Sequence, residues 1–273
     1  MTALIDEYVD WLRTCSRSRR TIGDRRDILN RIDADLPHGI TAATSDELKV
    51  WIYRDDWSPA TRETYYGAVR SFFVWATNPY DPKLDFNPTD LLPRPPAIRG
   101  LPRPVTDRQL QKILTEARDP FRLWSILAAY AGLRCCEIAQ LDRGDITETA
   151  VRIRKGKGNK PGVVPTHPAI WTAVKDLPDG PLAFTDTGEL AGAKYVSIRT
   201  ALYFRRNLKM PGVALHRLRH WYGTTTYKHT RDIRVTQELL RHSSPQTTAI
   251  YTLVDDEERR AAIQTLPTFS GSN

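Results

Sequence analysis

The chain has little cysteine and no long apolar run, and each shortage excludes a class of protein or site. It contains 3 Cys in 273 residues, of which Cys135 and Cys136 are adjacent and Cys15 stands alone. This number and placement exclude a disulfide framework and a cysteine metal site, so we expect reduced side chains without a catalytic role. No run of about 18 apolar residues is present, and the acidic, amphipathic N-terminal segment differs from a secretion signal. We therefore expect a soluble intracellular protein without a membrane partner.

Acidic residues are scarce in the second part of the chain when they are compared with Lys and Arg. Residues 1–91 hold 12 Lys/Arg against 15 Asp/Glu, whereas residues 106–273 hold 25 against 17. The segment 92–105 between them has three arginines and no acidic residue. The basic excess behind the net charge of +8 therefore lies after residue 91, which is typical of a protein that binds a polyanion. Six of the arginines in residues 1–91 lie from Arg13 to Arg26 and form either a solvated helix end or a phosphate-contacting patch.

Apolar periodicity divides the chain into three parts. In residues 1–91 apolar side chains recur at helical spacing, and Ser58 followed by Pro59 marks a helix start, so we predict a small helical bundle. Residues 92–104 hold five prolines without helical periodicity, which predicts a semi-rigid linker. Residues 105–273 are predicted to be helical except for one β-hairpin within "AVRIRKGKGNKPGVVP". The predicted fold is mainly α with a small β-hairpin or sheet, in the α+β class.

Four short stretches after the linker carry groups suited to phosphate chemistry. They are "AGLRCCEIAQL" with Arg134 and Glu137, "RKGKGNKPG" with Lys157 and Lys160, "LHRLRHWYGT" with His216 and Arg219, and "LLRHSSPQTTAIYTLV" with His242 and Tyr251. Arginine binds phosphate oxygens through two parallel donors, lysine or histidine can protonate a leaving oxygen, and tyrosine can act as a nucleophile. Together these groups indicate phosphoryl transfer.

The order and spacing of these stretches resemble the motifs of the tyrosine recombinase, or phage integrase, family, which includes the Xer and Cre recombinases. The resemblance covers residues 106–265 closely and residues 1–91 only in their helical pattern. It implies that Tyr251 attacks the scissile phosphate and forms a 3′-phosphotyrosine, and that no metal ion or other cofactor takes part. The other residues that the resemblance implies are Arg134, Arg219 and His242 on the non-bridging oxygens, Lys157 as general acid, His216 in proton handling, and Glu137 in support.

The resemblance also implies how the protein meets DNA. Residues 1–91 would form a core-binding (SAM-like) domain, residues 92–104 a linker, and residues 105–273 a catalytic domain that ends in a subunit-docking segment. The two domains would close as a C-shaped clamp on core-type attachment sites in double-stranded DNA, and four copies would assemble there. A directionality factor or a host DNA-bending protein remains a possible further partner. The residues expected to contact DNA are Arg17, Arg19, Arg20, Arg94, Arg99, Arg103 and Lys160.

Several roles stay open within this family. The first helix begins within the first few residues, so we expect no arm-binding domain and a short integrase that integrates and excises a phage or mobile-element genome in the bacterial cytoplasm. The alternatives are Xer-type resolution of chromosome or plasmid dimers, a type IB topoisomerase-like activity, and a catalytically silent DNA-binding relative. Arg241 stands where the family usually has glycine, and we expect its side chain to point to solvent rather than to contact phosphate.

Overall fold

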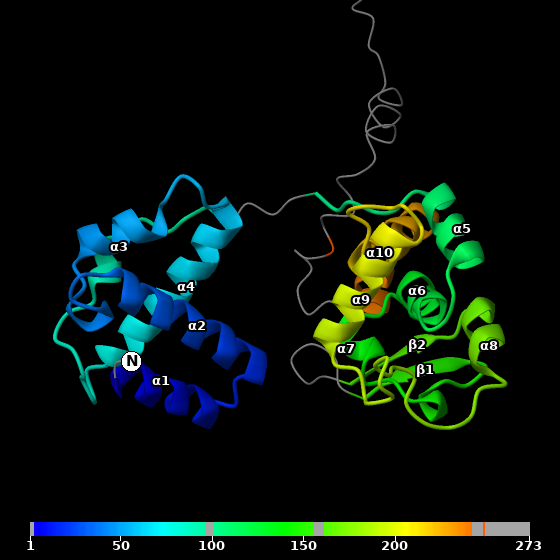
Figure 1. Ribbon diagram of the computed structural model, residues 1–273, viewed down its shortest axis with the longest axis horizontal. Coiled ribbons are helices and arrows are strands. Elements are labelled where there is room, and N and C mark those ends of the chain that lie inside the picture. The colour runs from blue at the N-terminus through cyan, green and yellow to red at the C-terminus, as the bar shows by residue number, and fades with distance from the viewer. Residues whose placement is uncertain (1–2, 97–100, 155–160, 242–247, 249–273) are drawn as a thin grey trace, which may run out of the picture. The chain divides into compact units, whose positions relative to one another are not determined.

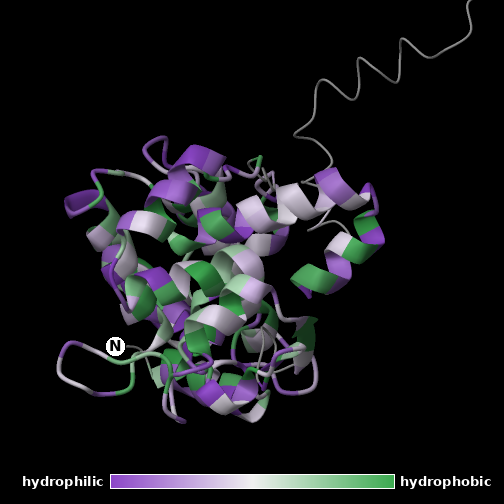
Figure 2. Cartoon of the chain, turned by 90° about the vertical axis from the view of Figure 1, so that its right-hand side faces the viewer, coloured by the Kyte–Doolittle hydropathy of each residue, from purple (hydrophilic) through white to green (hydrophobic). Residues whose placement is uncertain are grey.

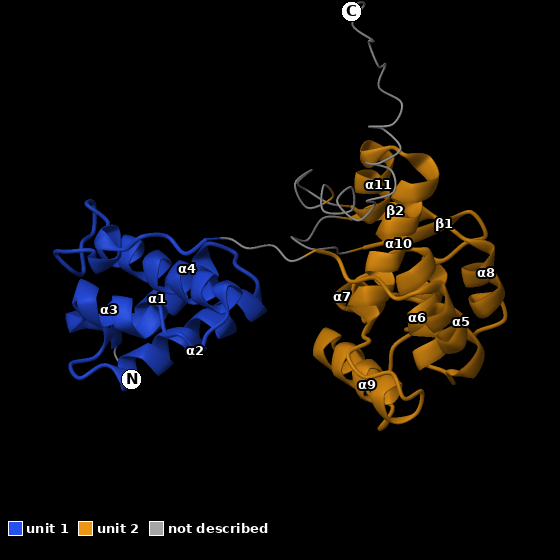
Figure 3. Ribbon diagram, turned by 90° about the horizontal axis from the view of Figure 1, so that it is seen from above, with its two compact units in different colours: residues 1–100 blue, residues 101–273 orange. Residues whose placement is uncertain are grey.

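The computed structural model describes residues 3–96, 101–154, 161–241 and 248, and the chain divides into two compact units. These units comprise residues 1–100 and residues 101–273, and Figure 3 colours them separately. The division falls within the Pro/Arg segment that follows the first helices. Each unit has a hydrophobic core of its own, so each is described by itself.

The first unit is a bundle of helices (Figure 1). The helices are α1 (Ala3–Thr14), α2 (Arg19–Asp35), α3 (Ser45–Ile52) and α4 (Pro59–Ala76), with the 3-10 turns η1 (Ile40–Ala42) and η2 (Pro88–Leu91). Ser58 begins α4 as the sequence predicts, because its hydroxyl accepts a hydrogen bond from the Thr61 N–H at 3.1 Å and Pro59 takes the first helical position. Buried side chains such as Ile5, Leu29 and Phe72 meet in the centre of the bundle.

The second unit surrounds one buried helix with other helices and a small sheet. Its elements are α5 (Asp107–Glu116), α6 (Phe121–Tyr130), α7 (Cys135–Ile138), η3 (Arg143–Asp145), β1 (Ala150–Ile153), β2 (Gly162–Pro165), α8 (Pro168–Val174), α9 (Ala193–Arg206), α10 (Leu215–Thr230) and α11 (Ile233–Leu240). The strands pair antiparallel, with Val151 opposite Val164. The prediction of a mainly α fold with a small antiparallel sheet is therefore confirmed.

Helix α6 forms the centre of the second unit because it is apolar on nearly every face. Leu123, Trp124, Leu127 and Ala128 are all buried, and the Trp124 indole donates a hydrogen bond to the Leu182 carbonyl at 3.1 Å. Helix α10 packs against α6. Figure 2 shows hydrophobic and hydrophilic residues alternating along the helices, as expected where one face is buried and the other meets water.

Residues 103 to 105 are attached to α10. The Arg217 guanidinium donates to the carbonyls of Arg103 at 2.8 Å and Pro104 at 3.2 Å, and the Val105 N–H donates to the Arg217 carbonyl at 3.4 Å. The last residues of the predicted linker thus belong to the second unit. In the described part of the chain, no helix combines the length and the apolar character needed to cross a membrane.

Candidate active site

A glycine turn after α6 begins the site. The backbone of Gly132 has φ 59°, in the left-handed region that glycine adopts without steric cost. A Cβ atom at this position would lie 2.5 Å from Cδ1 of Tyr222 on α10, so a larger residue cannot fit without displacing that ring. Tight packing of Tyr222 against the turn therefore fixes the path of the chain just before Arg134.

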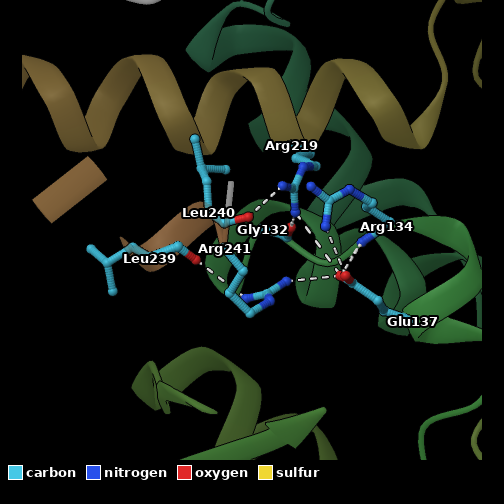
Figure 4. Close-up of polar contacts among 7 residues, drawn as sticks. All are labelled: Gly132, Arg134, Glu137, Arg219, Leu239, Leu240 and Arg241. Carbon is cyan, nitrogen blue, oxygen red and sulfur yellow. Dashed lines mark hydrogen bonds and ion pairs between the residues drawn. The ribbon is translucent and has the colours of Figure 1, made fainter. Parts of the chain in front are cut away.

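Glu137 on α7 lies at the centre of a group of arginines (Figure 4). Its residue is 2% exposed. One carboxylate oxygen, Oε1, accepts a hydrogen bond from Nη1 of Arg134 at 2.9 Å, and the other, Oε2, accepts one from the Arg134 backbone N–H at 2.8 Å. Arg134 itself precedes the first residue of α7, so Glu137 caps the helix and orients the arginine in one arrangement.

Arg219 on α10 is held beside Glu137 by main-chain carbonyls. Its Nη1 donates to the Gly132 carbonyl, and its Nη2 donates to the Leu240 carbonyl at the end of α11 at 2.6 Å. Nη1 also lies 4.0 Å from Oε2 of Glu137. The side chain is 3% exposed, so this guanidinium is fixed by the fold before any ligand binds. One arginine thereby joins the glycine turn, α7 and α11.

Arg241 contradicts the expectation that it points to solvent. Its side chain is 13% exposed, and its Nη2 donates to Oε2 of Glu137 at 2.8 Å. Residue 241 ends α11 with φ 52°, and its side chain extends across Gly162 of β2, where a Cβ would lie 2.6 Å from Arg241 Cδ. The prediction failed because the partner lies 104 positions away in the sequence. The replacement of the usual glycine was the one signal that this position is special.

The electrostatics of the cluster leave it with excess positive charge. Burial by itself raises the pKa of Glu137, but the charge of Arg241, the Arg134 N–H and the charges of Arg219 and Arg134 outweigh it and lower this pKa. The carboxylate is therefore ionised at neutral pH. Because one carboxylate faces three guanidinium groups, the cluster suits an anion such as a phosphate diester.

His216 and His220 lie one turn apart on α10, with ring centroids 4.1 Å apart. Loss of solvation, followed by the positive charges of Arg219 and Arg134, lowers the pKa of His216. The pKa of His220 is lowered to about 4, first by burial and then by His216, Arg219 and Arg217. Both rings are therefore neutral at pH 7, and a neutral imidazole can accept a proton or donate a hydrogen bond.

The predicted site residues divide into two groups. The structure brings Arg134, Glu137 and Arg219 into contact, and His216 stands on the same helix as Arg219, one turn before it. The predicted residues that lie outside the described part of the chain are Arg99, Lys157, Lys160, His242 and Tyr251, together with the docking segment after residue 254. Within the described residues, no group of three or more His, Cys, Asp or Glu is arranged to hold a metal ion.

The predicted DNA-contacting arginines that the structure describes are exposed. Arg17, Arg19 and Arg20 lie at the corner between α1 and α2, and Arg20 is 3.6 Å from Asp24. Arg94 is exposed and lies 3.5 Å from Glu63. Arg103, in the second unit, is exposed although its carbonyl accepts the hydrogen bond from Arg217. These side chains are available to an outside partner.

Known proteins resemble the chain over most of its length. The model of the phage integrase family matches residues 103–258. The tyrosine recombinase XerC of Mycobacterium tuberculosis is 31% identical over 294 positions, covering 96% of this chain and 97% of that protein. XerC of Chromohalobacter salexigens is 32% identical over 188 positions, and that match spans 63% of this chain and 63% of that protein.

The fold also matches solved structures. A lambda integrase (75–356) dimer bound to a COC′ core site has a TM-score of 0.75 and 18% identity, covering 95% of this chain and 96% of that one. A lambda integrase tetramer bound to a Holliday junction has a TM-score of 0.73 and 17% identity, covering 91% and 76%. At these identities the likeness concerns the fold.

Proposed function

Because the chain belongs to the phage integrase family of tyrosine recombinases, as its four motifs predicted, we propose that it cuts and rejoins duplex DNA at specific sites through a 3′-phosphotyrosine intermediate. The observation that carries this proposal is the arginine cluster around Glu137. Arg134 and Arg219 come from motifs 85 positions apart in the sequence, yet one buried carboxylate gathers both. Fixed donors of this kind stabilise the charge that develops on a phosphate during transfer.

In the proposed reaction, the Tyr251 oxygen attacks phosphorus while Arg134, Arg219 and His242 bind the non-bridging oxygens. The new tyrosine–phosphorus bond replaces the bond to the 5′ oxygen, and Lys157 protonates that oxygen as it leaves. The neutral His216 accepts a proton or donates a hydrogen bond beside the phosphate. Reversal of these steps with a 5′ hydroxyl from another strand rejoins the DNA, so no external energy source is needed.

The proposed substrate is double-stranded DNA in a bacterial cell. We assign the exposed arginines Arg17, Arg19, Arg20, Arg94 and Arg103, with Arg99 and Lys160, to phosphate contacts along the duplex. We further propose that four copies assemble on two core-type sites and that residues 255–273 dock onto a neighbouring copy. The likeness of the fold to a lambda integrase tetramer bound to a Holliday junction supports this assembly.

Two cellular roles fit this chemistry. The first is integration and excision of a phage or mobile-element genome, with a directionality factor or a DNA-bending protein as an additional partner. The second is Xer-type resolution of dimeric chromosomes or plasmids, which the match to XerC over 96% of the chain favours. Recombination between two sites flanking the gene would support the first role, whereas recombination at a chromosomal dimer site would support the second.

The experiment that tests the proposed chemistry uses nicked duplexes cut from DNA flanking the gene. Wild type, Tyr251→Phe and the control Tyr80→Phe, which makes the same change at a tyrosine that is 96% exposed, are incubated with each duplex. We expect a protein–DNA band on a denaturing gel with wild type and the control and none with Tyr251→Phe. A band that persists with Tyr251→Phe would refute Tyr251 as the nucleophile. Relaxation of supercoiled DNA without strand exchange would instead indicate a type IB topoisomerase-like enzyme.

A further inference from the structure

Arg241 stands in a backbone conformation that favours glycine. It ends α11 with φ 52°, and its N–H donates to the Glu238 carbonyl at 2.9 Å, as residues that end helices in this way do. A glycine would adopt this conformation with less strain. An arginine here therefore has a local cost, which contacts of its side chain have to offset.

The side chain makes two contacts that join α11 to the site. Nη2 donates to Oε2 of Glu137 at 2.8 Å, and Nη1 donates to the carbonyl of Leu239 at 3.2 Å (Figure 4). The residue before it, Leu240, accepts a hydrogen bond from Arg219 through its carbonyl. Two adjacent residues at the end of α11 thus bind the two partners Glu137 and Arg219 that lie side by side in the cluster.

The distances around Oε2 show what Arg241 prevents. This oxygen accepts from the Arg134 N–H and from Arg241, both at 2.8 Å, and these two bonds use its two lone pairs. Nη1 of Arg219 lies 4.0 Å away, beyond hydrogen-bond distance, and donates to Gly132 instead. If Arg241 were absent, Nη1 of Arg219 would lie 4.0 Å from the oxygen with the vacated lone pair. A small shift toward Glu137 would turn Arg219 away from its carbonyl partners.

We propose that Arg241 is a positioning residue that occupies Glu137 so that Arg134 and Arg219 keep the orientation in which they bind the phosphate. The inference rests on the proposed function, because the orientation matters for phosphate transfer. Arg241 acts through Glu137 and Arg219 and makes no contact with DNA in this scheme. It therefore raises the rate of phosphotyrosine formation and contributes little to the affinity for DNA.

The test compares Arg241→Gly and Arg241→Lys with the control Arg231→Gly. Arg231 is an exposed arginine that ends α10 with φ 53°, so the control makes the same change of charge and backbone freedom at the end of another helix. Two quantities are measured on the nicked duplex: the dissociation constant, and the single-turnover rate of covalent adduct formation at saturating protein. Urea unfolding of each full-length variant shows whether it remains folded.

We expect Arg241→Gly to slow adduct formation by roughly 10- to 100-fold, because a displacement of about 1 Å in a catalytic group has effects of this size. Its dissociation constant should change by less than about twofold, and its urea midpoint should stay near that of wild type, since glycine relieves the backbone. Arg241→Lys, which keeps one donor for Glu137, should restore part of the rate. Arg231→Gly should react at the wild-type rate.

Four other outcomes would overturn the inference, and the measured rate, affinity and urea midpoint distinguish them. Equal adduct rates for wild type and Arg241→Gly would remove the positioning role and leave the proposed function intact. A weaker affinity with an unchanged rate at saturation would mean that Arg241 contacts DNA itself. Arg241→Gly could lose both rate and urea midpoint while Arg241→Lys restores none of the rate. That result would indicate that Arg241 has only a structural role. Absence of adduct with wild type would overturn the proposed function and this inference with it.

Discussion

Two arginines, one from each unit, differ in how firmly the protein holds them. At the corner between α1 and α2, the side chain of Arg20 is 87% exposed and lies 3.6 Å from Asp24, so water competes with its partner. In the second unit Arg219 is 3% exposed and bonded to two carbonyls before any DNA arrives. Exposed arginines attract and retain a polyanion, whereas buried ones present donors in one geometry. The first kind suits affinity and the second suits chemistry.

The largest difference between the two kinds of arginine should appear when their carboxylate partners are removed. Glu137→Ala leaves buried guanidinium groups without their anion, so we expect the free energy of unfolding to fall by about 3–5 kcal/mol. The control Asp24→Ala removes an exposed partner 3.6 Å from Arg20 and should change it by less than about 1 kcal/mol. Urea unfolding of both variants measures this. Equal losses would mean that burial does not distinguish the two pairs.

A smaller effect on stability is expected when a partly buried histidine is compared with an exposed one. The folded-state pKa of His220, about 4, lies below the ordinary value of 6.5, so the unfolded chain binds more protons between these pH values. Stability should therefore fall as the pH drops from 6.5 to 4, by at most about 2 kcal/mol because water screens this partly buried ring, and His220→Gln should lack this part of the slope. The control His229→Gln changes an exposed histidine elsewhere on α10. Unfolding curves at several pH values measure the slope of the free energy of unfolding against pH. Identical slopes for all three proteins would contradict the prediction.

The smallest effect should come from replacing a single exposed arginine, and it should appear in the affinity for DNA. Arg19→Gln should weaken DNA binding by a few-fold at low salt and reduce the slope of log affinity against log salt by about one, because one phosphate contact is lost. The rate of adduct formation at saturating protein should stay unchanged. Fluorescence anisotropy at several salt concentrations measures the slope. A slower reaction at saturation would show that this arginine also affects the chemistry.

Local features of the fold were predictable because their causes lie within a few residues. Thr106 begins α5 as expected for an N-cap, with its hydroxyl accepting from the Gln109 N–H at 3.2 Å. The hairpin formed where alternation and glycines replaced helical spacing, and Arg134 and Glu137 met because they are three positions apart. The motifs also identified the family, since four of them occur in the right order.

Long-range contacts were not predictable in the same way. The bond from Arg241 to Glu137 depends on where α11 ends relative to α7, and no spacing rule connects residues so far apart. The carbonyl partners of Arg219 could not be predicted from the sequence either, because every residue has a carbonyl. Only the folded chain places those of Gly132 and Leu240 beside this side chain. The sequence could identify which groups carry the chemistry, but packing decides which of them are held in place.

The dependence of the cluster on the end of α11 has a consequence for protein synthesis. Arg219 donates to the Leu240 carbonyl and Glu137 accepts from Arg241, and these two residues leave the ribosome more than a hundred residues after Glu137. A growing chain, or one truncated before α11, lacks these two restraints on Arg219 and Glu137. The arrangement of Arg219 and Glu137 is therefore completed only after residues 240 and 241 have been made. In the proposed enzyme this order limits the action of unfinished copies on DNA.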